Sequence, residues 1–423
     1  MTTAQVDRSY RALLAVPALG RVVLGMQLAR IAQSMVGVAI VLFALSVYHS
    51  PVLAGIVAFA SSAPGMLASP LAGALLDRHG RTRLVMLDYL LAALSLVTIA
   101  LLSTGGMLPA WLLVAIAAAA SLTGPLSTTG LRSLFPLMVP RHLWERVNAL
   151  DSSGYVVATI VGPPVAGVLL QVIGPEPALA AIGALFVVAA MVLLRIPDPR
   201  TSVASTGSLL LDAWQGIVYT WRNTTLRALG FSLTTTNIGN GIMYIAIPLL
   251  VLGRLHGGPA AVGLAFALQG VGGVIAAVAF GRMDTRGRER QLLYLPMLGM
   301  AAVLLLLLPD WGVLPFALVM LVLGVLNGPI DISLFTIRQR RTDPAWLGRA
   351  FAISMAFNAL GVPVGAALAG SLANWSLEGA IVIAIVAALA GAFIARRFIP
   401  ATDDSAGITG ATTVAQESTP APT

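Results

Sequence analysis

The sequence predicts an all-α membrane protein with 12 transmembrane helices, arranged as two pseudo-symmetric six-helix bundles. The composition, the spacing of the apolar segments and an internal repeat lead to this prediction. Of the 423 residues, 58% are hydrophobic and 10% are charged, whereas soluble domains carry about 25% charged residues. The chain has too few charged and polar residues to form a water-exposed surface, so we expect its surface to face lipid.

Twelve apolar segments of suitable length follow one another along the chain. A bilayer core of about 30 Å takes about 20 residues of helix, and turn-forming pairs such as Ser50-Pro51 and Gly174-Pro175 separate the segments. We expect helices over 22–46, 52–76, 84–103, 111–135, 150–172, 177–195, 228–252, 260–281, 291–308, 314–336, 350–373 and 377–396.

The charged residues indicate the orientation. A net charge of +8 would suit nucleic acid, but the arginines lie in short loops between apolar segments, as in a membrane protein whose positive loops stay inside. We therefore expect the lipid bilayer and not nucleic acid as a partner, in a bacterial cytoplasmic (inner) membrane, with both termini cytoplasmic. The expected inner loops hold Arg78, Arg81, Arg83, Arg141, Arg146, Arg195, Arg200, Arg222, Arg227, Arg286, Arg288, Arg290, Arg338, Arg340, Arg341, Arg349, Arg396 and Arg397, and the outer loops Arg254.

Four segments make up the predicted domain organisation. Residues 1–200 form the N-terminal bundle with a cytoplasmic N-terminus, and 228–400 form the C-terminal bundle. Residues 201–227 form a cytoplasmic linker, in which Leu210, Trp214, Ile217 and Trp221 are spaced as on an amphipathic helix at the membrane interface. The tail 401–423, rich in Thr, Ala and Pro, is expected to be disordered.

An internal repeat relates the two bundles. A shift of 207 residues places Ala58-Phe59-Ala60 on Ala265-Phe266-Ala267, Gly65 on Gly272, and Asp77, Gly80, Arg81 and Arg83 on Asp284, Gly287, Arg288 and Arg290. Apolar matches arise easily in such a composition, but a matching charged loop does not. Parallel repeats of this kind place a site between the halves near the bilayer midplane.

Missing residue types exclude several kinds of chemistry. The chain has no cysteine, and its 25 basic residues are all arginine. Disulfides and thiolate metal sites are therefore excluded, as are a P-loop and a Schiff base, which need lysine. The four histidines lie in loops without metal-ligand spacing, and no nucleophile–base pair is visible. We expect no enzyme activity, no metal and no cofactor, with the proton gradient as the energy source.

The segment Gly73-Ala-Leu-Leu-Asp77-Arg78-His-Gly80-Arg81-Thr-Arg83 closely resembles the loop signature of the major facilitator superfamily. Further on, Arg132-Ser-Leu-Phe-Pro136 and Gly162-Pro163-Pro164-Val-Ala-Gly167 resemble its drug:proton antiporter branch, which includes macrolide-efflux and enterobactin-exporter permeases. The resemblance covers residues 15–400. It implies the major facilitator fold and a monomer that exports amphipathic small molecules by alternating access.

The resemblance also implies roles for several residues. Asp77 would dock onto a helix N-terminus of the other half, and Gly73, Arg78, Gly80, Arg81, Asp284 and Arg288 would complete a cytoplasmic gate. The alternative is that these residues only fix the topology. Gly162, Pro163 and Gly167 resemble an antiporter signature, although close helix packing through small residues explains them equally well. Many members have an acidic residue at the position of Gln33, so that proton carrier is absent here.

Polar residues within apolar segments are candidates for the transport site, because burying them in a bilayer is costly. Arg30, roughly 14 Å into its helix, and Gln33 share one face, and the repeat pairs them with Asn237 and Asn240. With Tyr244, these residues are expected to line a substrate cavity; the alternative is hydrogen bonding within each half.

Asp331 is the candidate proton carrier, and an ion pair with Arg338 or Arg30 is its alternative role. Arg132 either reaches the interface or pairs with an acidic residue, whereas Asp88 and Asp151 lie near helix ends. An importer of a nutrient or siderophore, with Arg30 as an anion anchor, remains the alternative function.

Overall fold

The chain is entirely helical over the residues described in the computed structural model, which are 9–196, 209–280, 283, 285–343 and 346–400. Eleven helical segments in these ranges are long and apolar enough to cross a membrane. Helix α14 (Glu289–Leu305), with 17 residues, packs against α15 (Val313–Arg340) and α18 (Leu377–Phe398). It corresponds to the helix predicted over 291–308, and its length of about 26 Å approaches the thickness of the bilayer core.

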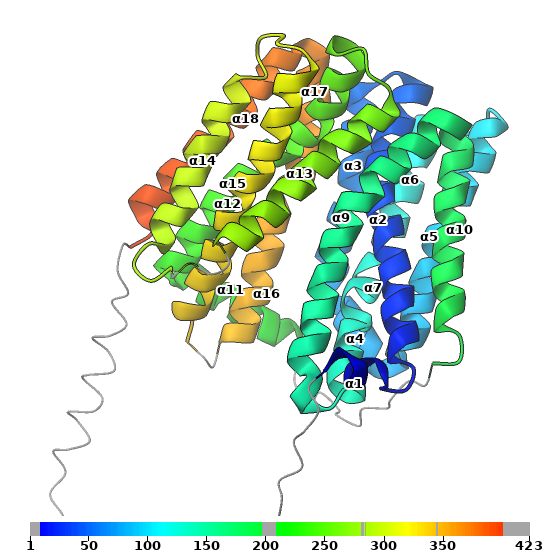
Figure 1. Cartoon of the computed structure of the whole chain (residues 1–423), viewed down its shortest axis with the longest axis vertical. Coiled ribbons are helices and arrows are strands. Elements are labelled where there is room, and N and C mark those ends of the chain that lie inside the picture. Colours follow the sequence, from blue (N-terminus) through cyan, green and yellow to red (C-terminus); the bar gives the residue numbers. More distant parts are fainter. Residues whose placement is uncertain (1–8, 197–208, 281–282, 284, 344–345, 401–423) are drawn as a thin grey trace, which may run out of the picture.

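The two predicted halves are visible as two bundles (Figure 1). The first contains α1 (Tyr10–Leu14), α2 (Leu19–Tyr48), α3 (Pro51–Ala60), α4 (Ala63–His79), α5 (Arg81–Thr104), α6 (Ala110–Ser121), α7 (Gly124–Gly130), η1 (Arg132–Leu134), α8 (Phe135–Met138), η2 (Arg141–Leu143), α9 (Trp144–Ile173) and α10 (Pro175–Leu193). The second contains α12 (Thr224–Leu249), η3 (Leu250–Arg254), α13 (Pro259–Phe280), α14, α15, α16 (Leu347–Ala359), α17 (Gly361–Trp375) and α18.

Three predicted helices are interrupted, which corrects the sequence-based boundaries. The helix expected over 52–76 breaks at Ser61 and Ser62, before Pro64, and the one expected over 350–373 breaks at Leu360, before Pro363. The helix expected over 111–135 divides into α6, α7, η1 and α8. A proline lacks the N–H that would continue the preceding turn and clashes with it, so α4, α7, α8 and α17 each start with proline in their first turn. Helix α9 begins at Trp144, earlier than the predicted residue 150.

The linker contains the predicted amphipathic helix, α11 (Leu209–Arg222). Trp214, Ile217 and Trp221 are each more than 40% exposed, so the protein leaves their apolar surface uncovered. Tyr219 stacks on Trp346 with 5.1 Å between ring centroids, which attaches α11 to the second half. Residues 201–208 of the predicted linker and the whole predicted tail 401–423 lie outside the described residues.

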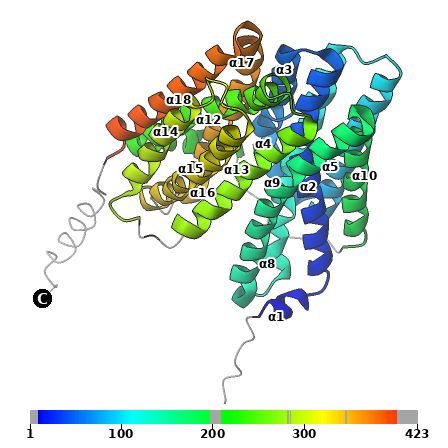
Figure 2. The ribbon, with the colours of Figure 1, turned by 45° about the horizontal axis from the view of Figure 1, so that its top comes forward.

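The halves meet along two helix pairs, α9 with α13 and α3 with α17, and Figure 2 shows α9 beside α13 from a second direction. Glycines permit this approach. A Cβ on Gly55 or Gly370 would lie 2.3 or 2.4 Å from a carbonyl oxygen of the opposite half, and one on Gly167 or Gly263 would lie 2.3 Å from such an oxygen. These four glycine contacts lie toward the end of the bundle that carries the turns at His49 and His256, so the halves are closed at that end.

Candidate substrate and coupling site

A cavity of about 810 Å³ lies between the two halves. Helices α2 and α9 line it from one half, and α12, α13, α14, α15 and α17 from the other. Most of its lining is apolar, and Asp331 is the charged side chain among the described lining residues. The polar residues around it are Gln33, Ser34, Tyr155, Thr159, Asn240, Tyr244, Gln269 and Asn327.

Asp331 lies on α15, about 14 Å along the helix axis from Arg340. Within the described part of the chain it makes no hydrogen bond or ion pair. Arg338, which we considered as its partner, is 1% exposed and donates to the hydroxyl of Ser354 over 2.9 Å and to its carbonyl oxygen over 3.2 Å. The carboxylate of Asp331 therefore faces the cavity.

The predicted cavity residues separate into two groups. Gln33, Asn240 and Tyr244 line the central cavity. The Nδ2 of Asn237 instead donates to the carbonyl oxygen of Asn358 over 2.9 Å, and its Oδ1 accepts from Asn240 over 3.3 Å. Arg30 also turns away from the central cavity. The symmetric arrangement of two polar pairs facing each other is thus incomplete, because Arg30 and Asn237 bond within their own halves.

Tyr244 reaches across the cavity to the opposite half. A Cβ placed on Gly37 of α2 would lie 2.6 Å from the Tyr244 hydroxyl oxygen. The tyrosine ring also packs against Phe266 of its own half, with 5.3 Å between the ring centroids. The 207-residue repeat relates positions 37 and 244, so the contact joins two equivalent positions of the two halves.

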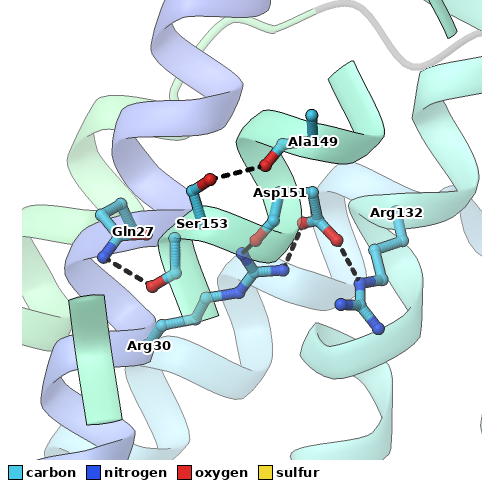
Figure 3. A network of polar contacts seen from close by, with 7 residues as sticks. Gln27, Arg30, Arg132, Ala149, Asp151 and Ser153 are labelled. Atoms are coloured by element: carbon cyan, nitrogen blue, oxygen red, sulfur yellow. Dashed lines mark hydrogen bonds and ion pairs between the residues drawn. The ribbon is translucent and has the colours of Figure 1, made fainter. Parts of the chain in front are cut away.

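A charged network occupies the inner part of the first half (Figure 3). Asp151 of α9 accepts from the NH2 group of Arg30 over 2.5 Å and from the Nε of Arg132 over 2.8 Å. The NH1 of Arg30 also donates to the Asp151 carbonyl oxygen over 2.9 Å. Both guanidinium groups lie over the ring of Tyr155, at 4.1 and 4.6 Å from its centroid. One carboxylate and one aromatic ring thus hold two arginines together.

This network differs from what the sequence suggested. Arg132 forms an ion pair with Asp151, which is one of its two predicted roles. Asp151, expected near a helix end without a further role, lies seven residues after the start of α9 and pairs with two arginines. The side chains of Arg30 and Asp151 are only 11% and 9% exposed, so the pair is enclosed. Tyr155 was missed altogether, although its position one turn after Asp151 on α9 is a signal that the sequence offered.

The predicted gate is described only in part. The surroundings of Gly73, the side chains of Asp77 and Arg78, and the whole of Asp284 lie outside the described part of the structure. The NH1 of Arg81 donates to the Ser133 carbonyl oxygen over 2.8 Å, and Arg288 directly precedes α14. Gly80 and Gly287 have φ angles of +93° and +73°. Glycine adopts such angles readily, which explains why it recurs at this position of both loops.

The glycines of the fifth predicted helix pack closely. A Cβ on Gly162 would lie 2.6 Å from Ser34 Cβ, within the first half. Gly167 faces the carbonyl oxygen of Pro259 across the halves, and Pro163 presents its carbonyl oxygen to Gly263. This geometry accounts for the small residues by close packing and also places two of the three positions at the contact between the halves.

Two bundles of membrane-spanning helices around a shared cavity define a membrane transporter. The family model for transmembrane secretion effectors matches residues 14–417, and the chain belongs to this family of the major facilitator superfamily.

Relatives support this assignment. An uncharacterized major-facilitator-type transporter of Sinorhizobium fredii is 37% identical over 394 residues, covering 93% of this chain and 97% of the relative. The multidrug efflux pump Tap of Mycobacterium tuberculosis is 26% identical over 355 residues, covering 80% and 83%. Macrolide efflux protein A of Streptococcus pyogenes is 22% identical over 341 residues, covering 76% and 82%.

Solved structures share the fold. The nucleoside transporter NupG, in a mutant form, superposes with a TM-score of 0.73 at 12% identity and covers 90% of this chain and all of its own. A bacterial homologue of the human lysosomal transporter Spinster, in an inward-facing and unoccupied conformation, gives a TM-score of 0.71 at 14% identity, with 95% and 100% covered. The predicted major facilitator fold is therefore confirmed.

Proposed function

We propose that this protein is a secondary active transporter that exports amphipathic small molecules in exchange for protons by alternating access. The observation that carries the proposal is the central cavity, which combines a large, mostly apolar lining with one carboxylate that has no partner among the described residues. Apolar walls suit cargo that needs few fixed polar contacts, with a small number of polar groups for orientation.

Asp331 is the group through which a proton gradient can act on the cargo. A carboxylate facing a cavity inside the bilayer is costly when ionised and unpaired. Binding a proton removes this cost, and so does a cargo that carries positive charge or donates hydrogen bonds. Proton and cargo then compete for the same group, which is the requirement for exchange.

The close packing at one end supports alternating access. With both termini in the cytoplasm, as the arginine distribution predicts, the turns at His49 and His256 lie outside, and the packed ends of α3, α9, α13 and α17 close the outer side. The cavity is then reached from the cytoplasm. Opening to the outside requires α3 to separate from α17 and α9 from α13 at the four glycine contacts. Rocking of the halves would at the same time bring their inner ends together.

Export is favoured over import by two findings. Two of the three named relatives are, by name, a multidrug efflux pump and a macrolide efflux protein. The residue that favoured import, Arg30 as an anchor for an anionic nutrient, is bound by Asp151 and Tyr155, and it does not line the central cavity.

Transport into everted vesicles of the cytoplasmic membrane tests this function. A panel of lipophilic cations, macrolides and siderophores is offered with and without an imposed pH gradient, acidic inside. We expect at least one compound to accumulate with the gradient and to dissipate it, and vesicles without the protein to do neither. Saturable uptake into right-side-out vesicles, with no accumulation in everted ones, would show import instead.

A further inference from the structure

A second cavity, of about 360 Å³, lies inside the first half, apart from the interface between the halves. The junction of α3 and α4 contributes to its lining, together with α2, α5, α6, α7 and α10. Gln33 lines both this cavity and the central one, so the two spaces adjoin at its side chain. Asp331 belongs to the central cavity, and nothing in the proposed exchange uses the second one.

The second cavity has its own carboxylate, that of Asp88 on α5. This residue is 5% exposed, and the hydroxyl groups of Thr123 and Ser127 lie close to its carboxyl group, while donating to the carbonyl oxygens of Ala120 and Gly124. Among the described residues that line this cavity, none is basic. Three charged or titratable groups of the packed helices, Arg30, Tyr89 and Tyr155, face an adjoining space of about 200 Å³, and Arg30 is paired with Asp151.

The hydroxyl groups that line the second cavity present oxygen acceptors. Ser62, Ser95 and Ser121 each donate to a backbone carbonyl three or four residues earlier, over 3.0, 2.8 and 2.8 Å, and Thr128 does the same over 3.3 Å. A hydroxyl has one proton to donate and two lone pairs. Because the proton is committed to the backbone, what each hydroxyl can offer a ligand in the cavity is an oxygen acceptor. The Ser121 oxygen has one lone pair left for this, since it also accepts from the Gly65 N–H over 3.2 Å.

One carboxylate, several oxygen acceptors and no basic residue among the described lining form an environment that attracts a cation. Hard cations bind oxygen ligands of this kind, and an ionised carboxylate inside a membrane-spanning bundle is costly until a cation neutralises it. The cavity has room for an ion together with water molecules.

We propose that this cavity is a monovalent-cation site of the N-terminal half, in which Asp88 supplies the negative charge, and that it fills independently of Asp331. Sodium and the proton share the relevant chemistry, since either neutralises the carboxylate. Gln33 lines both cavities, so an ion bound at this site lies in a space that shares a side chain with the central cavity.

Equilibrium binding of radioactive sodium to the purified full-length protein in lipid nanodiscs tests the proposal without any cargo. At pH 8.5 we expect saturable binding in the wild type and in Asp331→Asn, and a loss of at least tenfold in affinity in Asp88→Asn. Ser95→Ala, which removes one acceptor and keeps the carboxylate, should weaken binding several-fold and serves as the second variant if Asp88→Asn does not fold. Acidification should displace the sodium.

The second arm addresses the proton. If sodium does not bind, an infrared carboxyl band that titrates in the wild type and in Asp331→Asn, and is missing in Asp88→Asn, would identify the proton as the occupant and support the site. Sodium binding that persists unchanged in Asp88→Asn would overturn the proposal, as would the absence of both sodium binding and an Asp88-dependent carboxyl band. Because no transport is measured, these outcomes are separate from the success or failure of the export proposal.

Discussion

The hydroxyl oxygen of Tyr244 lies in the space that a side chain at Gly37 would occupy, 2.6 Å from the position of its Cβ. Two positions related by the internal repeat thus touch across the cavity, one with a large side chain and the other with none. The contact narrows the central cavity between α2 and α12, and it can exist only while position 37 has no Cβ.

A methyl group at position 37 should therefore disturb Tyr244. We expect Gly37→Ala to displace the tyrosine ring and to reduce the transport rate several-fold. Adding Tyr244→Phe should restore most of the rate, because the next atom after the hydroxyl oxygen, Cζ, lies 3.9 Å from the added Cβ, an ordinary contact distance. Initial rates of the two single variants and the double variant provide the measurement. Additive losses in the double variant would show that the contact does not matter.

Separating the closed ends of the two halves should make the central cavity accessible from the other side of the membrane. In Gly167→Ala, the added Cβ would lie 2.3 Å from the Pro259 carbonyl oxygen, so α9 and α13 must move apart. The chain has no cysteine, so a single Met243→Cys substitution reports accessibility without background. We expect a membrane-impermeant maleimide added outside intact cells to label this cysteine several-fold faster in Gly167→Ala. Gly253→Ala, which meets no atom within 4 Å, is the matched control and should leave labelling unchanged.

The two arginines of the enclosed network should contribute unequally to the free energy of unfolding. Removing Asp151 by Asp151→Ala leaves two arginines without their counter-charge, and breaking a buried ion pair costs about 3 kcal/mol or more. Arg30→Ala should cost a similar amount. Arg132→Ala should cost much less, because its side chain is 45% exposed, compared with 11% for Arg30. Thermal unfolding of the three variants in nanodiscs checks this order, and equal losses for the two arginines would contradict it.

The interrupted helices and the internal network mark the limits of what the sequence could predict. The length of each apolar segment and the arginine-rich loops between segments are local properties of the sequence, so the order of the spans could be predicted from them. The Asp-Arg loop that recurs in both halves indicated the internal repeat. The breaks at Ser61 and Leu360 depended on which prolines begin a new helix, and Pro163, Pro164 and Pro329 lie inside helices that continue. Sequence alone does not separate the two cases.

The site was predicted less completely for the same reason. Gln33, Asn240, Tyr244 and Asp331 were singled out because polar groups within apolar segments are rare, and all four line the central cavity. Arg30 and Asn237 met the same criterion, yet they bond to Asp151 and Asn358, each 121 residues away in the chain. Such partners depend on how helices are rotated against each other. That rotation follows from side-chain packing, which helical periodicity does not specify.

The proposed exchange depends most on Asp331 coupling cargo to protons, and transport in proteoliposomes tests this directly. Asp331→Asn keeps the size of the side chain and removes its titration. For a cargo that the wild type accumulates with an imposed pH gradient, we expect the variant to lose gradient-driven accumulation while retaining counterflow, the exchange of labelled for unlabelled cargo. Accumulation at the wild-type level in Asp331→Asn would contradict the central claim and would place proton coupling elsewhere in the chain.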